Sequence, residues 1–467
     1  MAGRNARSDM PTCAVQALIA ALVLAVGSSL GGNLLFLLGL PLTLIGFVLA
    51  CRAASTWSSP AQTSAFSGIT IWLAAMATLG IVAPTTGGLL WYEVIKRAFA
   101  AVSVILVGML AGRDETWQRR AMLIAVSVGI ALFAIGPVGA PDPTIDVFTW
   151  TQTSVRALLH RINPYTVIAP DVYRGRHDPG YSVSVYPYMP ATLLIYAPWV
   201  SLFGDFRFGL GASLVVAIGL LHGIGRRLNV DPRLKDAAML AIVLHPSSSR
   251  MIESGWTEPL LVAAALLFVH FAIRNPAGIG QASSFLFLPA LKQYVVAPVV
   301  LYVFWTRQRM RLRTLVAALS ISTATVLPFL IWNKDATLSG MLFQMAAPTG
   351  PRLESTSLVA LIATITGAYP GRWTSAAVQL IVGAIAWRRL KDCGLSGLLL
   401  ASALSLYATF LVGWQAFVNY YYFVGALLVL AALTRSGRNS TPASDVCSPS
   451  TCQKNRDSEN DLSSVSI

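Results

Sequence analysis

The sequence predicts an all-α polytopic transmembrane bundle, with about twelve full spans and additional interfacial or re-entrant helices. Of its 467 residues, 55% are hydrophobic and 12% are charged, and the mean hydropathy is +0.63. Soluble domains carry about 25% charged residues. A water-soluble fold could not cover so much apolar side-chain surface, so we expect lipid to surround much of the chain.

The net charge of +14 comes largely from basic residues in short loops between apolar runs. The basic residues are at position 52 and within 113–120, 226–235, 307–313 and 388–391. Cytoplasmic loops of membrane proteins collect Lys and Arg in this way. The pattern therefore indicates membrane topology, and no nucleic-acid partner is expected.

Twelve apolar runs approach the roughly 20 residues that a spanning helix needs. They are 13–31, 34–51, 66–83, 97–112, 121–139, 208–225, 236–249, 257–273, 312–332, 372–387, 396–413 and 419–434. With the N-terminus inside, five crossings place the loop 140–190 outside. One further crossing, 208–225, returns the chain to the basic loop 226–235, so 191–204 must lie along the interface or re-enter.

The same parity fixes the remaining segments. The run 282–305 must cross twice or not at all, and Pro289 and Lys292 interrupt it, so we expect a broken hairpin with Lys292 at its outward tip. Residues 333–357 and the short apolar run 357–370 are predicted to lie outside. Residues 1–434 then form a single transmembrane catalytic domain. The polar segment 435–467 is predicted to be a disordered cytoplasmic tail.

The outer loop 140–190 is long, aromatic and rich in proline, and loops of this length are usually functional or disordered. Asp146 begins a helical stretch in this loop. Its side chain is either a helix cap or a general base at the membrane surface. Asp142 lies between two prolines, which favours a turn residue, and it is the second carboxylate candidate.

Five segments on the outward side resemble a known family. They are Asp146-Val147-Phe148, Ile162-Asn163-Pro164-Tyr165, Tyr186-Pro187-Tyr188-Met189-Pro190, 253–259, and Leu291-Lys292-Gln293-Tyr294. This pattern is similar to the GT-C membrane glycosyltransferases, in particular glycosyltransferase family 87 and the related actinobacterial mannosyltransferases that use polyprenyl-phosphate-mannose. The resemblance covers roughly 120–430 as architecture. It implies a GT-C-like fold, with Tyr186 and Tyr188 near the substrate.

Two features depart from the family pattern. Four apolar spans precede the span that leads into the Asp146 loop, which is more than the simplest layout. Several relatives carry a lysine before the proline that ends the loop, and this chain has Met189 there. A phosphate would therefore need another cation.

Lys292 is the leading cation, because it interrupts an apolar run on the same side as Asp146. The alternative is a lysine that extends from a helix end to the interface. Arg250 and Arg352 are the other outward cations, each of which could instead anchor the interface.

A second group of candidates lies between two proline residues. Glu253, Trp256 and Glu258 lie in the outward linker 245–257 or beside it, where a carboxylate could bind sugar hydroxyl groups and an indole could stack on a sugar. Trp256 could also belong to the aromatic belt of the interface. The same alternative holds for the aromatic cluster 414–422, in which Asn419 is the one polar oddity.

The function that this resemblance implies is inverting transfer of a hexose, with mannose the first candidate. The donor would be a polyprenyl-phosphate-sugar in the membrane, and the acceptor a glycolipid or glycan on the outer face of the cell membrane. Asp146 would deprotonate the acceptor hydroxyl, and Lys292 would stabilise the departing phosphate. The two side chains should border one cavity, about a sugar length apart.

The expected function has two rivals. A polytopic transporter or lipid flippase would also have broken helices, but polar residues would line its pathway from both sides. A structural membrane protein would leave the long outer loop unexplained. No cofactor and no metal are expected, because no Gly-rich phosphate loop and no ligand spacing occurs.

Overall fold

The computed structural model describes residues 10–30, 36–56, 62–63, 66–82, 88–110, 115–173, 184–276, 278–306, 312–343 and 350–437. Most of the predicted tail, from 438 onward, and part of the predicted outer loop, 174–183, lie outside the described residues. The described chain is helical throughout, apart from a two-residue antiparallel pairing of β1 (Met10–Pro11) with β2 (Gln62–Thr63), in which Met10 is opposite Thr63.

The first half of the chain supplies ten α-helices within the described residues. They are α1 (Thr12–Ser29), α2 (Phe36–Ser55), α3 (Phe66–Val82), α4 (Leu90–Leu110), α5 (Glu115–Gly139), α6 (Asp146–Leu159), α7 (Pro190–Phe203), α8 (Arg207–Arg227), α9 (Pro232–Val243) and α10 (Ser248–Glu253). A short 3-10 helix, η2 (Pro164–Thr166), lies between α6 and α7.

The second half of the chain supplies ten more. They are α11 (Glu258–Arg274), α12 (Ile279–Leu286), α13 (Leu288–Leu291), α14 (Val296–Thr306), α15 (Leu312–Trp332), α16 (Lys334–Leu338), α17 (Leu358–Thr366), α18 (Trp373–Leu390), α19 (Gly394–Leu411) and α20 (Val418–Gly437). The short turns η3 (Gln293–Val295) and η6 (Lys391–Cys393) are 3-10 helices, and η4 (Ser339–Phe343) is a π-helical turn.

Seven helical stretches within the described residues are long and apolar enough to cross a membrane. They are Thr12–Ser29, Leu38–Ser55, Thr116–Gly139, Arg207–Arg227, Leu312–Trp332, Trp373–Leu411 and Val418–Gly437. The stretch Trp373–Leu411 contains α18, η6 and α19. These helices mark the chain as a membrane-associated protein.

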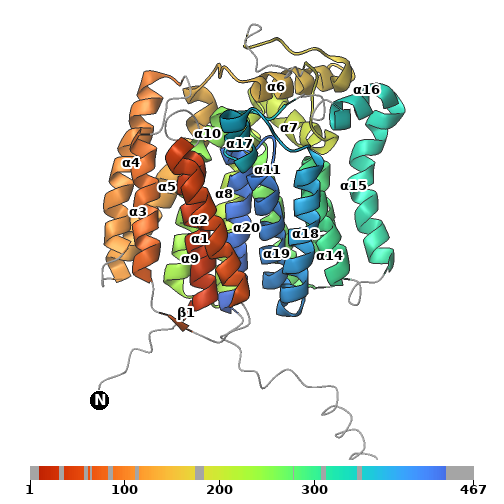
Figure 1. Cartoon of the computed structure of the whole chain (residues 1–467). Helices are drawn as coiled ribbons and strands as arrows, with labels where there is room; N and C mark the ends of the chain where they lie inside the picture. Colours follow the sequence, from red (N-terminus) through yellow and green to blue (C-terminus); the bar gives the residue numbers. More distant parts are fainter. Residues whose placement is uncertain are drawn as a thin grey trace, which may run out of the picture.

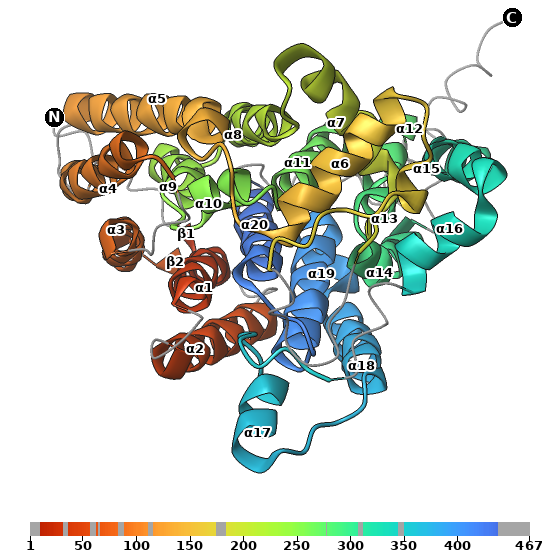
Figure 2. The ribbon, with the colours of Figure 1, turned by 90° about the horizontal axis from the view of Figure 1, so that it is seen from above.

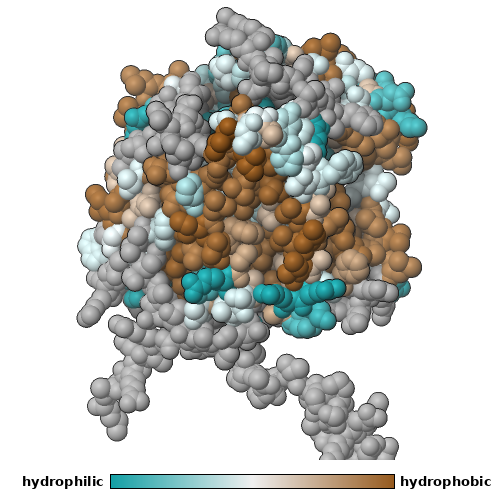
Figure 3. Space-filling model, viewed as in Figure 1, coloured by the Kyte–Doolittle hydropathy of each residue, from teal (hydrophilic) through white to brown (hydrophobic). Residues whose placement is uncertain are grey.

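The surface of the bundle agrees with a lipid environment. Figure 3 shows a broad brown band of apolar residues across the middle of one face, with hydrophilic residues below it. Exposed apolar side chains include Val48 on α2 and Leu380, Ile381 and Ile385 on α18. Soluble monomers rarely expose contiguous apolar patches larger than a few hundred Å², so this band requires lipid or a partner to cover it.

The centre of the bundle is formed by α20, which packs against α1, α11 and α19 (Figure 2). Both α19 and α20 are buried along almost their whole length. Around them, α8 packs between α5 and α11. At one end of the bundle, α6 lies across the helix ends (Figures 1 and 2). We call this the α6 end.

Within the described residues, each of the twelve predicted runs overlaps a helix, but not every run is one continuous helix. The run 236–249 was expected to be a single span. Instead α9 has 12 residues, about 18 Å at ~1.5 Å per residue, and cannot cross a ~30 Å hydrocarbon core alone. The chain breaks at 244–247, where Pro246 lies, and α10 continues toward the α6 end (Figure 1).

The segments predicted not to be ordinary spans are all short. α7 has 14 residues and α17 has nine. The interrupted run has two arms, Ile279–Leu291 and Gln293–Trp305, which meet at Lys292. Lys292 has an extended backbone (φ −154°, ψ 132°), so the predicted break in this hairpin is confirmed.

Candidate active site at the α6 end

Asp146 lies at the first residue of α6. The preceding Ile145 is extended (φ −145°, ψ 136°) and provides no side-chain cap. The Asp146 Oδ1 atom accepts a hydrogen bond from the Val147 backbone N–H at 2.7 Å. The N-cap is therefore Ile145 and not Asp146, which the capping interpretation expected there; the Asp146 carboxylate still accepts one amide of the first turn, and it also lines a cavity.

The sequence of α6 makes it amphipathic, and its apolar face packs on α7. Val147, Trp150 and Val155 lie on this buried face. Gln152 ties the helix down, because its Nε2 donates to the Gly204 carbonyl at 2.6 Å and its Oε1 accepts from the Phe206 N–H at 3.4 Å. These contacts fix α6 on the turn between α7 and α8.

Arg207 fixes the chain that leads into Asp146. Its guanidinium is completely buried and donates to the backbone carbonyls of Ala140, Pro137 and Glu253 at 2.7, 3.1 and 2.9 Å. It also pairs with Asp205 at 2.6 Å. One side chain on α8 thereby joins the end of α5, where the segment 140–146 begins, to the end of α10.

The Asp146 cavity has a volume of about 290 Å³, close to the lower end of the ~300–1,000 Å³ range of small-molecule sites. Its charged, aromatic and amide lining comprises Asp146, Trp150, Tyr173, Tyr188, Arg250, Trp256, Arg352, Glu354, Gln415, Phe417, Asn419 and Tyr420. The lining combines two carboxylates, two guanidinium groups and several aromatic rings. These are the groups that bind and orient a polyhydroxylated ligand.

Tyr173 contacts the Asp146 carboxylate directly. Burial, followed by the negative charge of Asp146, raises the pKa of Tyr173 to about 12. The phenol therefore stays neutral at physiological pH, and its hydroxyl donates a hydrogen bond to the carboxylate. This contact orients Asp146 toward the cavity that both residues line.

Two arginines line the same cavity, and their neighbours differ. Arg352 forms an ion pair with Glu354 and lies 5.3 Å from the centre of the Phe417 ring. Arg250 lies 5.5 Å from the centre of the Trp256 ring, and its buried Nε atom has no hydrogen-bond partner. A buried N–H group without an acceptor is unfavourable by roughly 1–3 kcal/mol, so Arg250 favours an anion beside it.

Lys292 is paired inside the protein. Its Nζ donates to the Glu258 Oε1 at 2.5 Å, and both side chains are buried. The rings of Tyr188, Tyr294 and Tyr420 surround the ammonium, with centres at 5.2, 5.5 and 5.1 Å. The Tyr294 hydroxyl and the Asn419 amide also donate to Glu258, at 3.2 and 3.0 Å.

A second cavity lies beside Lys292 and has a volume of about 410 Å³. Its lining includes Lys292, Tyr294, Met341, Arg372, Phe410 and Trp414. This Lys292 cavity shares Tyr188, Gln415 and Tyr420 with the Asp146 cavity. The expectation that Asp146 and Lys292 border one cavity is therefore corrected: they line neighbouring cavities with a common wall, because the pairing with Glu258 holds Lys292 on the far side.

The Asn-Pro-Tyr and Tyr-Pro-Tyr segments support this wall. The Asn163 side chain caps η2, accepting from the Tyr165 N–H at 2.9 Å, and the Tyr165 hydroxyl donates to the Tyr188 carbonyl at 2.8 Å. Gln293 donates to the carbonyls of Pro187 and Met341 at 2.9 and 2.7 Å. Segments predicted as separate motifs thus meet around Tyr188.

Four of the predicted substrate-binding residues line neither cavity. Asp142 is exposed outside them. Tyr186 is buried and shares a 2.5 Å hydrogen bond with Thr192. Glu253 is buried and pairs with Lys96 at 2.8 Å, and Glu258 is held beneath Lys292. Because their polar groups are directed into the protein, the last three act as supports.

Several lining residues were not among the predicted site residues, and Tyr173, Asn419 and Tyr420 are the most informative of them. The sequence favours an interfacial belt for the cluster 414–422, yet Phe417, Asn419 and Tyr420 line the Asp146 cavity. The polar Asn419 among aromatic neighbours was the available signal. The sequence around Tyr173 contains no signal of this kind, because only the fold brings Tyr173 close to Asp146.

No protein-family model matches the chain, and no curated protein matches its sequence.

Proposed function

We propose that this chain is a GT-C-like membrane glycosyltransferase with twelve membrane crossings and its active site on the outer face. It moves a hexose, with mannose the first candidate, from a polyprenyl-phosphate-sugar to a glycolipid or glycan. The observation that carries the proposal is Asp146, a carboxylate in a cavity that also holds two guanidinium groups and sugar-sized aromatic faces.

Each substrate matches one of the two cavities. The Lys292 cavity is lined mainly by apolar and aromatic residues, which suits the lipid-linked donor. The Asp146 cavity is lined by charged groups and hydrogen-bonding side chains, which suits the sugar and the acceptor hydroxyl. The wall of Tyr188, Gln415 and Tyr420 lies where the two would meet.

The chemistry is a single displacement. The acceptor oxygen forms a bond to the anomeric carbon as the bond from that carbon to the phosphate oxygen breaks. Asp146 takes the proton of the acceptor hydroxyl, as a general base within hydrogen-bond reach does. The leaving polyprenyl phosphate gains negative charge, which Arg250 and Arg352 stabilise. One displacement inverts the anomeric configuration.

The contacts of Lys292 support a different role from the phosphate-binding role that the sequence suggests. In its pair with Glu258, the ammonium is neutralised and enclosed by three tyrosine rings. We assign Lys292 to positioning Tyr188 and Tyr420 in the shared wall, and we assign the departing phosphate to the two arginines.

The experiment is a transfer assay. The purified protein in lipid nanodiscs receives polyprenyl-phosphate-[¹⁴C]mannose and a membrane glycolipid extract. We expect label in a glycolipid product and release of polyprenyl phosphate. Parallel donors carrying glucose or arabinose identify the sugar. Label that remains on every donor would contradict the proposal, as expected of a transporter, which moves its substrate without breaking the sugar–phosphate bond.

A further inference from the structure

A third cavity lies at the α6 end, on the far side of Arg250 from the transfer site. It has a volume of about 90 Å³ and lies between α4, α10 and the end of α1. The Leu89 N–H donates to the Gly139 carbonyl at 2.7 Å, which places the start of α4 at the α6 end. Arg97 lies two helical turns from that start. We call this space the Arg97 cavity.

The charges in the Arg97 cavity are not balanced. Lys96 pairs with both of its carboxylates, Glu93 at 2.9 Å and Glu253 at 2.8 Å. Arg97 and Arg250 line the same space, and neither forms an ion pair within the described residues. Three cations therefore face two carboxylates. Both carboxylates are occupied by one lysine, which leaves Arg97 for an external anion, with Arg250 shared between this cavity and the Asp146 cavity.

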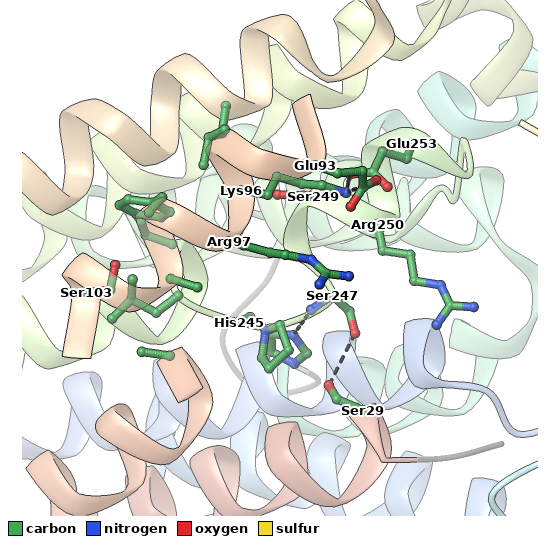
Figure 4. A pocket seen from close by; sticks show the side chains of 17 residues that line it. Ser29, Glu93, Lys96, Arg97, Ser103, His245, Ser247, Ser249, Arg250 and Glu253 are labelled. Atoms are coloured by element: carbon green, nitrogen blue, oxygen red, sulfur yellow. Dashed lines mark hydrogen bonds and ion pairs between the residues drawn. The ribbon is translucent and has the colours of Figure 1, made fainter. Parts of the chain in front are cut away.

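The remaining polar groups are mostly hydroxyls. Ser29 and Ser247 lie 3.2 Å apart, oxygen to oxygen, and Ser249 lines the cavity beside them. Figure 4 shows Arg97 extending from α4 toward Ser247, with Arg250 on the other side of the space. His245 accepts the Ser247 N–H on its Nδ1 at 3.1 Å, so its own proton, in the neutral ring, is on Nε2.

We propose that the Arg97 cavity binds a phosphate group. Two guanidinium forks and a set of hydroxyls present donors from several directions, and a phosphate offers several acceptor oxygens with negative charge. A volume of about 90 Å³ holds a few water-sized groups, since one water needs roughly 10–15 Å³ measured this way. The space therefore fits a phosphate group and not a hexose.

The phosphate can belong to a lipid or be free in solution, and the flank of the cavity favours lipid access. Val94 and Ile95, just before Arg97 on α4, are exposed, as are Leu90 and Trp91 near its start. Exposed apolar residues with a tryptophan near the end of the helix are typical of a helix that reaches the membrane interface. Arg97 lies about 9 Å deeper along α4 than Trp91, at ~1.5 Å per residue, and a long arginine side chain at such a depth extends toward the headgroup layer, where the phosphate of a phospholipid beside α4 lies.

The test measures binding by the full chain in detergent, without turnover, so its failure is distinct from failure of the transferase proposal. Native mass spectrometry compares adducts of phosphatidic acid with adducts of diacylglycerol, which lacks the phosphate. Thermal unfolding with added inorganic phosphate tests the free ion. The variant is Arg97→Gln, and the matched control is Arg156→Gln, which removes an exposed arginine of α6 that lines none of the three cavities.

We expect Arg97→Gln to weaken phosphate binding about tenfold to a hundredfold, the usual loss of a charge-assisted hydrogen bond. Arg156→Gln should match the wild type. Selective loss of phosphatidic acid identifies a lipid headgroup, and selective loss of the inorganic phosphate effect identifies the free ion. Arg97→Lys, which keeps the charge, guards against misfolding and should bind at an intermediate level. Equal binding by Arg97→Gln and the wild type in both arms would overturn the proposal.

Discussion

At the scale of single residues, burial decides what a charged side chain can do. Lys292 and Glu258 are 34 positions apart in the sequence, yet they form a buried pair at 2.5 Å. Glu258 Oε1 accepts from three donors, whereas its Oε2 is buried without a partner. Removing one member of such a pair leaves an uncompensated charge in a low-dielectric interior.

The variant Lys292→Met tests this pairing. We expect it to destabilise the protein by roughly 3–5 kcal/mol, because Glu258 would be buried without its counter-charge. The double variant Lys292→Met/Glu258→Gln should recover most of the loss, since the remaining amide is neutral. Thermal unfolding of the two variants in detergent makes the comparison. If the double variant were no more stable than the single one, Lys292 would not be acting through Glu258.

The variant Asp146→Asn tests the proposed base. Asparagine has a side-chain oxygen to accept the Val147 N–H and caps helices as well as aspartate does, so folding and donor binding should be unchanged. It has no basicity, so the transfer rate should fall about 10²–10⁴-fold. Single-turnover transfer with bound donor measures the rate. A cap with no catalytic role would give the wild-type rate.

The sequence indicates some of these residues and not others, for a physical reason. Asp146 is recognisable because it starts a helix in a long loop, and Lys292 because it interrupts an apolar run. Their partners, Tyr173 and Glu258, are determined by tertiary contacts that leave no local pattern. The sequence therefore marks Lys292 as unusual, whereas its pairing with Glu258 is visible only in the fold.

At the scale of elements, Arg207 holds three helix ends together. It joins α8 to the carbonyls at the end of α5 and of α10, beside the segment that carries Asp146. Methionine fills a similar volume but has no donors. Several buried carbonyls would then lose their hydrogen bonds, each at a cost of roughly 1–3 kcal/mol.

We therefore expect Arg207→Met to lower the unfolding temperature and the transfer rate together, although Arg207 lines neither substrate cavity. Arg156→Met, an exposed change on α6, is the control and should leave both unchanged. Unfolding curves and initial transfer rates, measured on the same preparations of each variant and of the wild type, make this comparison. A variant with wild-type stability and rate would show that the α5, α8 and α10 ends are held by other contacts.

The positions of the helices can be predicted from the lengths of the apolar runs. A break within a run can be predicted only where a polar residue interrupts it. The break at Lys292 was predicted because a charge interrupts the run. The break between α9 and α10 was not, because 236–249 is apolar enough to be read as one span despite Pro246. Its cause is local, since proline removes a backbone donor and clashes with the preceding turn.

At the scale of the whole molecule, the α6 end collects all three cavities, and η6 with its basic neighbours Arg388 and Arg389 lies toward the opposite end of α18. The parity of basic loops predicts that the α6 end is outside. In a chain whose natural cysteines are replaced, Thr144→Cys should react with a membrane-impermeant maleimide in intact cells. Asp392→Cys should react only after permeabilisation, and its labelling in intact cells would contradict the topology.

The most direct test of the central claim combines sidedness with chemistry. Right-side-out membrane vesicles containing the protein carry polyprenyl-phosphate-[¹⁴C]mannose in the bilayer, and a membrane-impermeant mannoside acceptor is supplied either outside or sealed inside. The account predicts labelled acceptor in the external medium with the wild type, and at least a hundredfold less with Asp146→Asn, the lower end of the ~10²–10⁴ range for a general base. Product formed only from acceptor sealed inside, or equal product from both proteins, would contradict it.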